Sequence, residues 1–340
     1  MDTTSPMANQ SAWIRAFRIP LPTWAWGVTA LAAVVLMATA APDAMPGDAA
    51  ILVAQHAGID DLAPLSHLVW GWIGSVFDTI PLGSLSHRWN LLSALSGAAC
   101  CGLTVLLAAR LPRVNPRWDL MVAHPRATAN LAGVAAGLLL LGCLPLRIAS
   151  AIALPATAEL LALLYAAWLL IRFAETRVLR LAYASLAVLS VTMTQSATAM
   201  LAAPAFVLFL LHLLTRQPII PPKHLAALAA ALMGPGLALL SISATWFLAQ
   251  PSAEWADLTH WGAVVTQMVR ELYIELRHGL PGIAIVLVAL FSLMPFAIVL
   301  FLTGGRTEGK PLLAALMIAL GVVQFLNLPF TPFAMFGLRP

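Results

Sequence analysis

Residues 181–215 read LAYASLAVLSVTMTQSATAMLAAPAFVLFLLHLLT, a run of 35 residues without Asp, Glu, Lys or Arg. As a single helix this run would be about 52 Å long, whereas the hydrocarbon core of a bilayer is about 30 Å thick. Its most polar part lies in the middle, at residues 190–196. The run therefore predicts a helical hairpin of two short membrane spans that turns near Gln195.

Comparable apolar runs cover much of the rest of the chain, at about 24–42, 89–109, 127–146, 148–171, 225–249, 279–303 and 311–330. Of the 340 residues, 61% are hydrophobic and only 9% are charged, against about 25% charged in ordinary soluble domains. Lipid must therefore be the solvent for much of the chain. The prediction is an all-α polytopic membrane protein with about nine transmembrane helices, in which a turn at residues 144–147 joins the third and fourth.

The whole chain, residues 1–340, is interpreted as a single transmembrane domain, or as the membrane portion of a longer protein. No basic run interleaved with aromatic residues suggests a nucleic-acid partner. Cys100, Cys101 and Cys143 lie inside apolar segments and lack metal-ligand spacing, so they predict packing rather than a metal site.

The placement of charges predicts the orientation in the membrane. With a cytoplasmic N-terminus, 13 of the 18 Lys and Arg residues fall in cytoplasmic segments and five in outer segments. This distribution follows the positive-inside rule. A single crossing by residues 181–215 would reverse all later segments and place Arg216, Lys223, Arg306 and Lys310 outside. We therefore expect a bacterial inner-membrane protein whose acid-rich side, and any functional site, faces the periplasm or exterior.

Two outer segments, at about 43–88 and 250–278, are long enough to fold. In the first, apolar residues recur at spacings of three and four: Leu62, Leu65, Val69, Trp72, Ile73, Val76 and Ile80. The second has a similar stripe at Trp261, Val264, Val265, Met268 and Leu272. Both patterns are typical of amphipathic helices that lie in the membrane interface.

Several short strings carry a resemblance to a known family. They include PGD at 46–48, IPLGS at 80–84, RWNLLSAL at 88–95, AEL at 158–160 and WADLT at 255–259. In this order they resemble a bacterial family of membrane proteins long catalogued as a domain of unknown function. That family is similar to the eukaryotic transmembrane protein O-mannosyltransferases, which belong to the GT-C glycosyltransferase superfamily. The similarity spans roughly residues 20–275, and RWNLLSAL is its most specific piece.

The resemblance implies transfer of a sugar from a polyprenyl-phosphate donor to a protein or glycan acceptor on the outer side. The histidines of the outer segments lack metal-ligand spacing, so neither a metal nor a cofactor is expected. Asp48 corresponds to the acid of the family's first outer loop. The chain also departs from the family, which has a glutamate at the position of Ile51 and a histidine near Ser196. Two alternatives therefore stay open. One is a catalytically degenerate relative that binds a lipid-linked glycan or a partner protein, and the other is a membrane transporter.

The candidate catalytic residues are Asp48 and Glu159. A carboxylate at the membrane surface can take a proton from an acceptor hydroxyl, although Asp48 could equally cap a helix. Glu159 is the only acid within an otherwise apolar span, and carboxylates inside membranes tend to be functional.

The candidate substrate-binding residues belong to the two outer segments, except Asn90, which lies at the start of the apolar run that follows the first of them. Arg88 or Arg270 could neutralise the donor phosphate, and Asp61 could supply the acid that Ile51 cannot. The remaining candidates are His67, Asn90 and Trp255.

Overall fold

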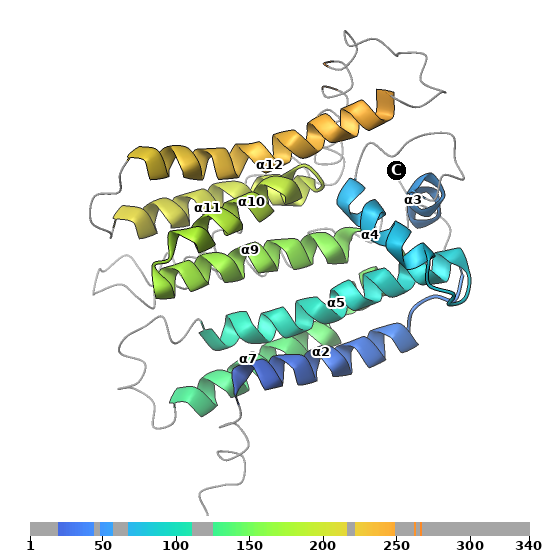
Figure 1. Cartoon of the computed structure of the whole chain (residues 1–340). Helices are drawn as coiled ribbons and strands as arrows, with labels where there is room; N and C mark the ends of the chain where they lie inside the picture. The colour runs from blue at the N-terminus through green and yellow to red at the C-terminus, as the bar shows by residue number, and fades with distance from the viewer. Residues whose placement is uncertain are drawn as a thin grey trace, which may run out of the picture.

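The computed structural model describes residues 20–43, 48–56, 67–110, 125–215, 222–248, 262 and 266. Every regular element within these ranges is an α-helix. Figure 1 shows the long helices lying alongside one another, with two short helices, α3 and α4, across one end. The elements are α2 (Leu21–Ala38), α3 (Asp48–His56), α4 (Leu68–Asp78), α5 (Leu85–Arg110), α7 (Pro125–Gly142), α8 (Leu144–Ala151), α9 (Ala156–Thr176), α10 (Leu179–Met193), α11 (Ala197–Thr215) and α12 (Pro222–Leu248).

Four helices of the described ranges are long and apolar enough to cross a membrane, and the bent pair formed by α7 and α8 would make a fifth. Two more apolar helices, Leu179–Met193 and Ala202–Leu211, are shorter. The protein is therefore a helical membrane protein. The count of nine spans stays a prediction, because the expected spans at 279–303 and 311–330 lie outside the described residues.

The hairpin predicted in residues 181–215 is present. α10 ends at Met193, and α11 begins at Ala197. Gln195 lies in the turn between them, where Gln195 N–H donates to the Thr192 carbonyl at 3.0 Å. The polar residues in the middle of the run therefore do mark the helix break.

The prediction of a tight turn at residues 144–147 was wrong, because these residues belong to a short helix. α7 ends at Gly142, and the separate short helix α8 follows at an angle of 60°. Pro145 lies in the first turn of α8, where its missing N–H costs no intrahelical bond. Pro155 then precedes α9. Each proline sits where a helix starts, so this connection is a short helix rather than a tight turn.

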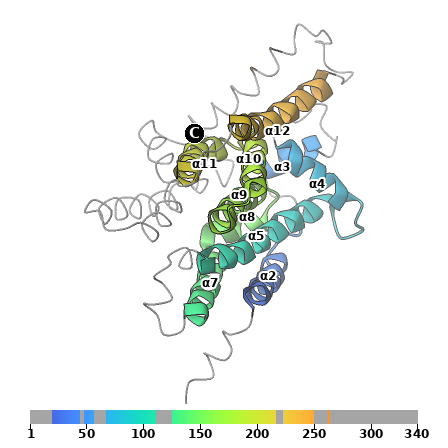
Figure 2. The same cartoon turned by 60° about the vertical axis from the view of Figure 1, so that its left-hand side comes forward.

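Two clusters of buried side chains hold the bundle together. α2, α5, α7 and α8 share one, and α9, α10, α11 and α12 share most of the other. α5 joins them because it packs against α2 and α7 on one side and α9 on another, as the turned view in Figure 2 also shows. On α7, a Cβ at Gly133 would lie 2.6 Å from the Val105 carbonyl oxygen, and one at Gly137 would lie 2.9 Å from that of Cys101. Small residues four apart let membrane helices approach this closely.

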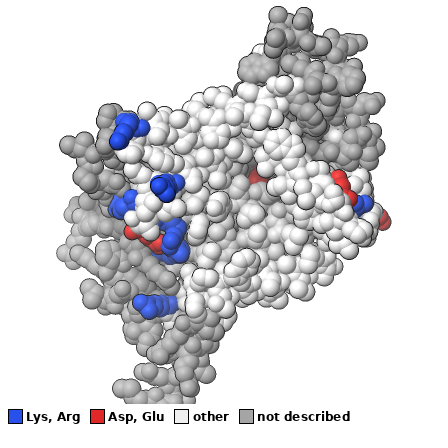
Figure 3. Space-filling model, in the orientation of Figure 1, with Lys and Arg blue, Asp and Glu red and all other residues white. Residues whose placement is uncertain are grey.

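The charged side chains gather at the two ends of the bundle (Figure 3). One end carries the basic residues Arg110, Arg126, Arg172, Arg177, Arg180 and Lys223, with Glu175 among them. The opposite end carries Asp43, Asp78, Arg88, Arg147 and Glu159. This grouping matches the two sides predicted from the sequence. We call the end with Glu159 the acidic end; that it faces outward stays a prediction.

Candidate functional site

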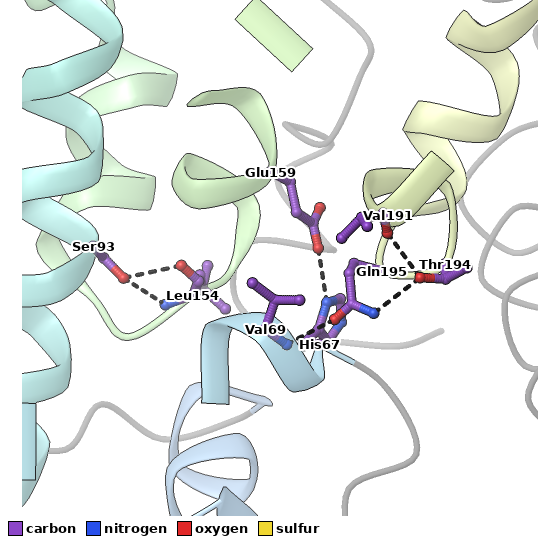
Figure 4. A network of polar contacts seen from close by, with 8 residues as sticks. All are labelled: His67, Val69, Ser93, Leu154, Glu159, Val191, Thr194 and Gln195. Atoms are coloured by element: carbon purple, nitrogen blue, oxygen red, sulfur yellow. Dashed lines mark hydrogen bonds and ion pairs between the residues drawn. The ribbon is translucent and has the colours of Figure 1, made fainter. Parts of the chain in front are cut away.

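A carboxylate and an imidazole meet at the acidic end. Glu159 Oε1 lies 2.7 Å from His67 Nδ1, and the two side chains are 18% and 12% exposed. Glu159 sits in the first turn of α9, where the helix dipole favours a negative charge. His67 immediately precedes α4 in a left-handed backbone conformation, with φ 57° and ψ 32°. Figure 4 shows both side chains pointing toward each other from these two elements.

Gln195 supports the same junction from a third element. Its side chain is 7% exposed, and its Oε1 accepts a hydrogen bond from Val69 N–H at 3.1 Å. Its Nε2 donates to Thr194 Oγ1 at 3.2 Å. The first N–H groups of a helix have no partner inside the helix, so Gln195 satisfies one of these groups of α4. The start of α4 is thus held both by α9 and by the α10–α11 turn.

Sequence reasoning identified Gln195 as a turn residue but gave it no role at the site. A signal was available, because Gln195 is the only amide side chain in residues 181–215. A buried amide must find hydrogen-bond partners. The sequence could not indicate that the partner is the backbone of α4, more than 120 residues away.

The string RWNLLSAL lies in the first turns of α5 and bonds this helix to the first outer segment and to the residues just after α2. Arg88 Nη1 donates to the Asp78 carbonyl oxygen, and Trp89 Nε1 donates to Asp78 Oδ1 at 2.7 Å. Asn90 Nδ2 donates to the carbonyl oxygens of Ala41 at 2.8 Å and Asp43 at 3.2 Å. The residues that carry the family resemblance therefore fix the geometry of the acidic end.

A second tie lies one turn further along α5 (Figure 4). Ser93 Oγ donates to the Leu154 carbonyl at 2.9 Å and accepts the Leu154 N–H at 3.2 Å. Thr157 Oγ1 donates to the Ser93 carbonyl at 3.1 Å. These bonds fix the start of α9, which includes Glu159, at one position along α5.

The predicted site residues are placed as follows. His67 and Glu159 are in direct contact. Asn90 is 2% exposed, and its side-chain amide donates to two backbone carbonyl groups. In this arrangement Asn90 therefore stabilises the fold rather than facing a substrate. Arg88 is partly buried, and its Nε has no hydrogen-bond partner. Asp48 is the first residue of α3, and the predictions for Asp61, Trp255 and Arg270 fall outside the described residues.

The arrangement offers specific chemistry. The Glu159 carboxylate forms an ion pair with the His67 imidazole when that ring is protonated, and this contact holds the ring at the start of α4. Such a pair can hold or orient a proton beside a polar substrate group. Within the ranges that the structure describes, no group of three His, Cys, Asp or Glu side chains could hold a metal ion.

Comparison with known proteins gives one partial likeness. No family model and no solved structure matches the chain. The fluoride-specific ion channel FluC of Chromohalobacter salexigens is 35% identical over 71 residues, which is 21% of this chain and 49% of that channel. The chain thus matches about half the length of that relative. Fold and comparison together establish a helical membrane protein that resembles a fluoride-specific channel over about a fifth of its length.

Proposed function

We propose that this protein is a GT-C-like glycosyltransferase. It would move a sugar from a polyprenyl-phosphate donor to a protein or glycan acceptor on the extracytoplasmic side of a bacterial inner membrane. The observation that carries the proposal is the Glu159–His67 contact of 2.7 Å, at the start of an apolar span and beneath two short outer helices. Carboxylates in otherwise apolar spans are costly and tend to serve function.

The order of elements supports the proposal. A first span, α2, is followed by two short helices, α3 and α4, and then by the long span α5. The GT-C resemblance implies this kind of first outer loop, with an acid near its beginning. Asp48 is the first residue of α3 and takes this place. Its proposed role is to accept the proton of the acceptor hydroxyl or to orient that hydroxyl.

Glu159, in the first turn of α9, contacts the first outer loop through His67. The carboxylate fixes His67, and His67 in turn begins α4. In the proposed mechanism this contact keeps the first outer loop in the position that the reaction needs. Arg88 or Arg270 neutralises the donor phosphate, since arginine forms strong charge-assisted bonds to phosphate. The unpartnered buried Nε of Arg88 favours Arg88 for this role.

The partial likeness to a fluoride-specific channel favours a second candidate, which is passage of a small anion. Transport sites commonly lie near the middle of the membrane, between broken helices. The break between α7 and α8 instead follows the last residue of α7, an 18-residue helix, and so lies at one end of the bundle. All charged side chains in the described ranges also lie at the two ends. These placements favour a surface site over a central pathway.

The proposal can be tested in inverted and right-side-out membrane vesicles. Undecaprenyl phosphates carrying radiolabelled mannose or glucose serve as donor probes, and membrane proteins and glycans serve as acceptors. Asp48→Asn should abolish transfer. Asp43→Asn is the matched control, since Asp43 is exposed in the same segment and only its backbone carbonyl has a role. Transfer that survives in Asp48→Asn would refute the proposed mechanism.

The same vesicles separate the alternatives. Binding of the donor probe by the wild type without any transfer would support a catalytically degenerate relative. Fluoride release from liposomes that contain the purified protein, above the rate of protein-free liposomes, would support the channel candidate.

A further inference from the structure

The short helix α4 is apolar on both of its faces. Leu68, Trp70, Gly71 and Gly74 face the protein and are buried. Trp72, Ile73 and Val76 are 46%, 43% and 63% exposed. The sequence predicted an apolar stripe through these three residues, and the structure shows that the stripe faces away from the bundle. A helix with large apolar residues on both faces favours an apolar environment on both sides.

The length of α5 indicates the depth at which α4 lies. α5 has 26 residues, or about 39 Å at 1.5 Å per residue, which exceeds the hydrocarbon core by about 9 Å. Its last residue, Arg110, pairs with Glu175 at 2.6 Å and marks the opposite, charged boundary. Counting about 20 residues from Arg110 reaches Asn90. Trp89 and Asn90 therefore lie at the outer limit of the hydrocarbon.

α4 packs directly on this boundary. The rings of Trp70 and Trp89 meet edge to face, with centroids 4.6 Å apart. Gly74 lies against the same Trp89 ring so closely that a Cβ there would be 2.2 Å from it. Trp89 is fully buried between α4 and α5. α4 thus sits at the level where hydrocarbon gives way to headgroups.

The orientation of α4 about its own axis is also fixed. His67 is held by Glu159, and Val69 N–H is held by Gln195. At the other end, Asp78 accepts the Trp89 indole proton. Contacts at both ends keep Trp72, Ile73 and Val76 on the outward face, so the helix cannot roll to bury them.

We propose that this outward face of α4 is embedded in the outer leaflet, where it contacts lipid acyl chains just below the headgroups. A tryptophan such as Trp72 suits that level, because its ring is amphipathic. The contact of this face with lipid does not depend on the proposed function, whereas its assignment to the outer leaflet shares the predicted orientation. One consequence does: the His67–Glu159 pair, at the start of the same helix, then lies at headgroup height, where a lipid-linked donor carries its phosphate and sugar.

The experiment places an NBD fluorophore on Ile73→Cys or Val76→Cys in a Cys143→Ala background. Cys100 and Cys101 are fully buried and should not be labelled. The protein is reconstituted in liposomes that contain lipids with a nitroxide near the headgroup or near the chain end, and iodide serves as the aqueous quencher. Leu208→Cys, on an exposed position of α11, is the lipid control. Asp43→Cys, in the exposed outer segment, is the aqueous control.

Fluorophores at positions 73 and 76 should be quenched several-fold more by the shallow nitroxide than by iodide, and more than by the deep nitroxide. Iodide quenching equal to that at position 43 would show that water covers the face and would overturn the proposal. Protection from every quencher would show a covering protein segment and would overturn it equally. Two labelled positions guard against a local effect of either substitution.

Discussion

Gly74→Ala is expected to destabilise the protein, although alanine normally stabilises a helix. The added Cβ would lie 2.2 Å from the Trp89 ring, so the ring or α4 must move by more than 1 Å to reach an ordinary contact of about 3.4 Å. Overpacking of this kind costs about 1–3 kcal/mol. The same movement stretches the bond of 2.7 Å between Trp89 Nε1 and Asp78 Oδ1, and an orphaned buried donor costs about 1–3 kcal/mol.

The gain in helix propensity offsets about 1 kcal/mol of this loss. The expected net effect is a destabilisation of about 1–5 kcal/mol, measured by unfolding in mixed micelles at increasing mole fraction of SDS. Gly27→Ala is the matched control, because a Cβ at Gly27, within α2, meets nothing within 4 Å. This control should be neutral or slightly stabilised. Equal stability of the two variants would refute the tight packing of α4 on Trp89.

The double variant Gly74→Ala with Trp89→Phe tests whether the cost of Gly74→Ala arises from overpacking against the Trp89 ring. A smaller ring makes room for the new methyl group, so the two substitutions should cost less together than the sum of their separate effects. Neighbours that share a contact show such coupling, typically 0.5–3 kcal/mol. Strict additivity would mean that the cost of Gly74→Ala does not arise at the Trp89 ring.

Two further predictions concern other contacts. Gln195→Leu leaves the partly buried Val69 N–H without its side-chain acceptor. A cost of about 1–3 kcal/mol should speed hydrogen exchange at Val69 about 5- to 150-fold. Unchanged exchange would contradict the capping role. Glu175→Gln breaks the partly exposed pairs with Arg110 at 2.6 Å and with Arg172 at 3.7 Å. Stability in SDS titrations should fall by less than about 1 kcal/mol at moderate salt. A larger loss would mean that these pairs are more deeply shielded than their exposure indicates.

The sequence predicted the hairpin at Gln195 because a polar cluster interrupts a run too long for one helix. It also predicted a helix over the α4 region, since the apolar spacing is helical. It did not predict which face of α4 packs inward, because both faces are apolar and the choice depends on the fit of Gly74 against Trp89 of α5. Periodicity alone carries no information of this kind.

At the candidate site, the sequence singled out Glu159 as an acid in an apolar span and named His67 without linking the two. Their contact depends on how α4 meets α9, which is a tertiary property. Asn90 was predicted to bind substrate, yet its amide donates to the backbone carbonyl groups of Ala41 and Asp43. Polar residues that anchor a scaffold and polar residues that bind a substrate look alike in a sequence.

The proposal for this protein depends on the acidic end facing outward. Cysteines introduced at Asp48 and at Arg180, which lie at opposite ends of the bundle, can be treated with a membrane-impermeant maleimide in intact bacterial spheroplasts. We expect the cysteine at position 48 to be labelled in intact spheroplasts, and the cysteine at position 180 to be labelled only after the membrane is permeabilised. Labelling of position 180 but not of position 48 in intact spheroplasts would contradict the proposed orientation and, with it, the extracytoplasmic glycosyltransferase site.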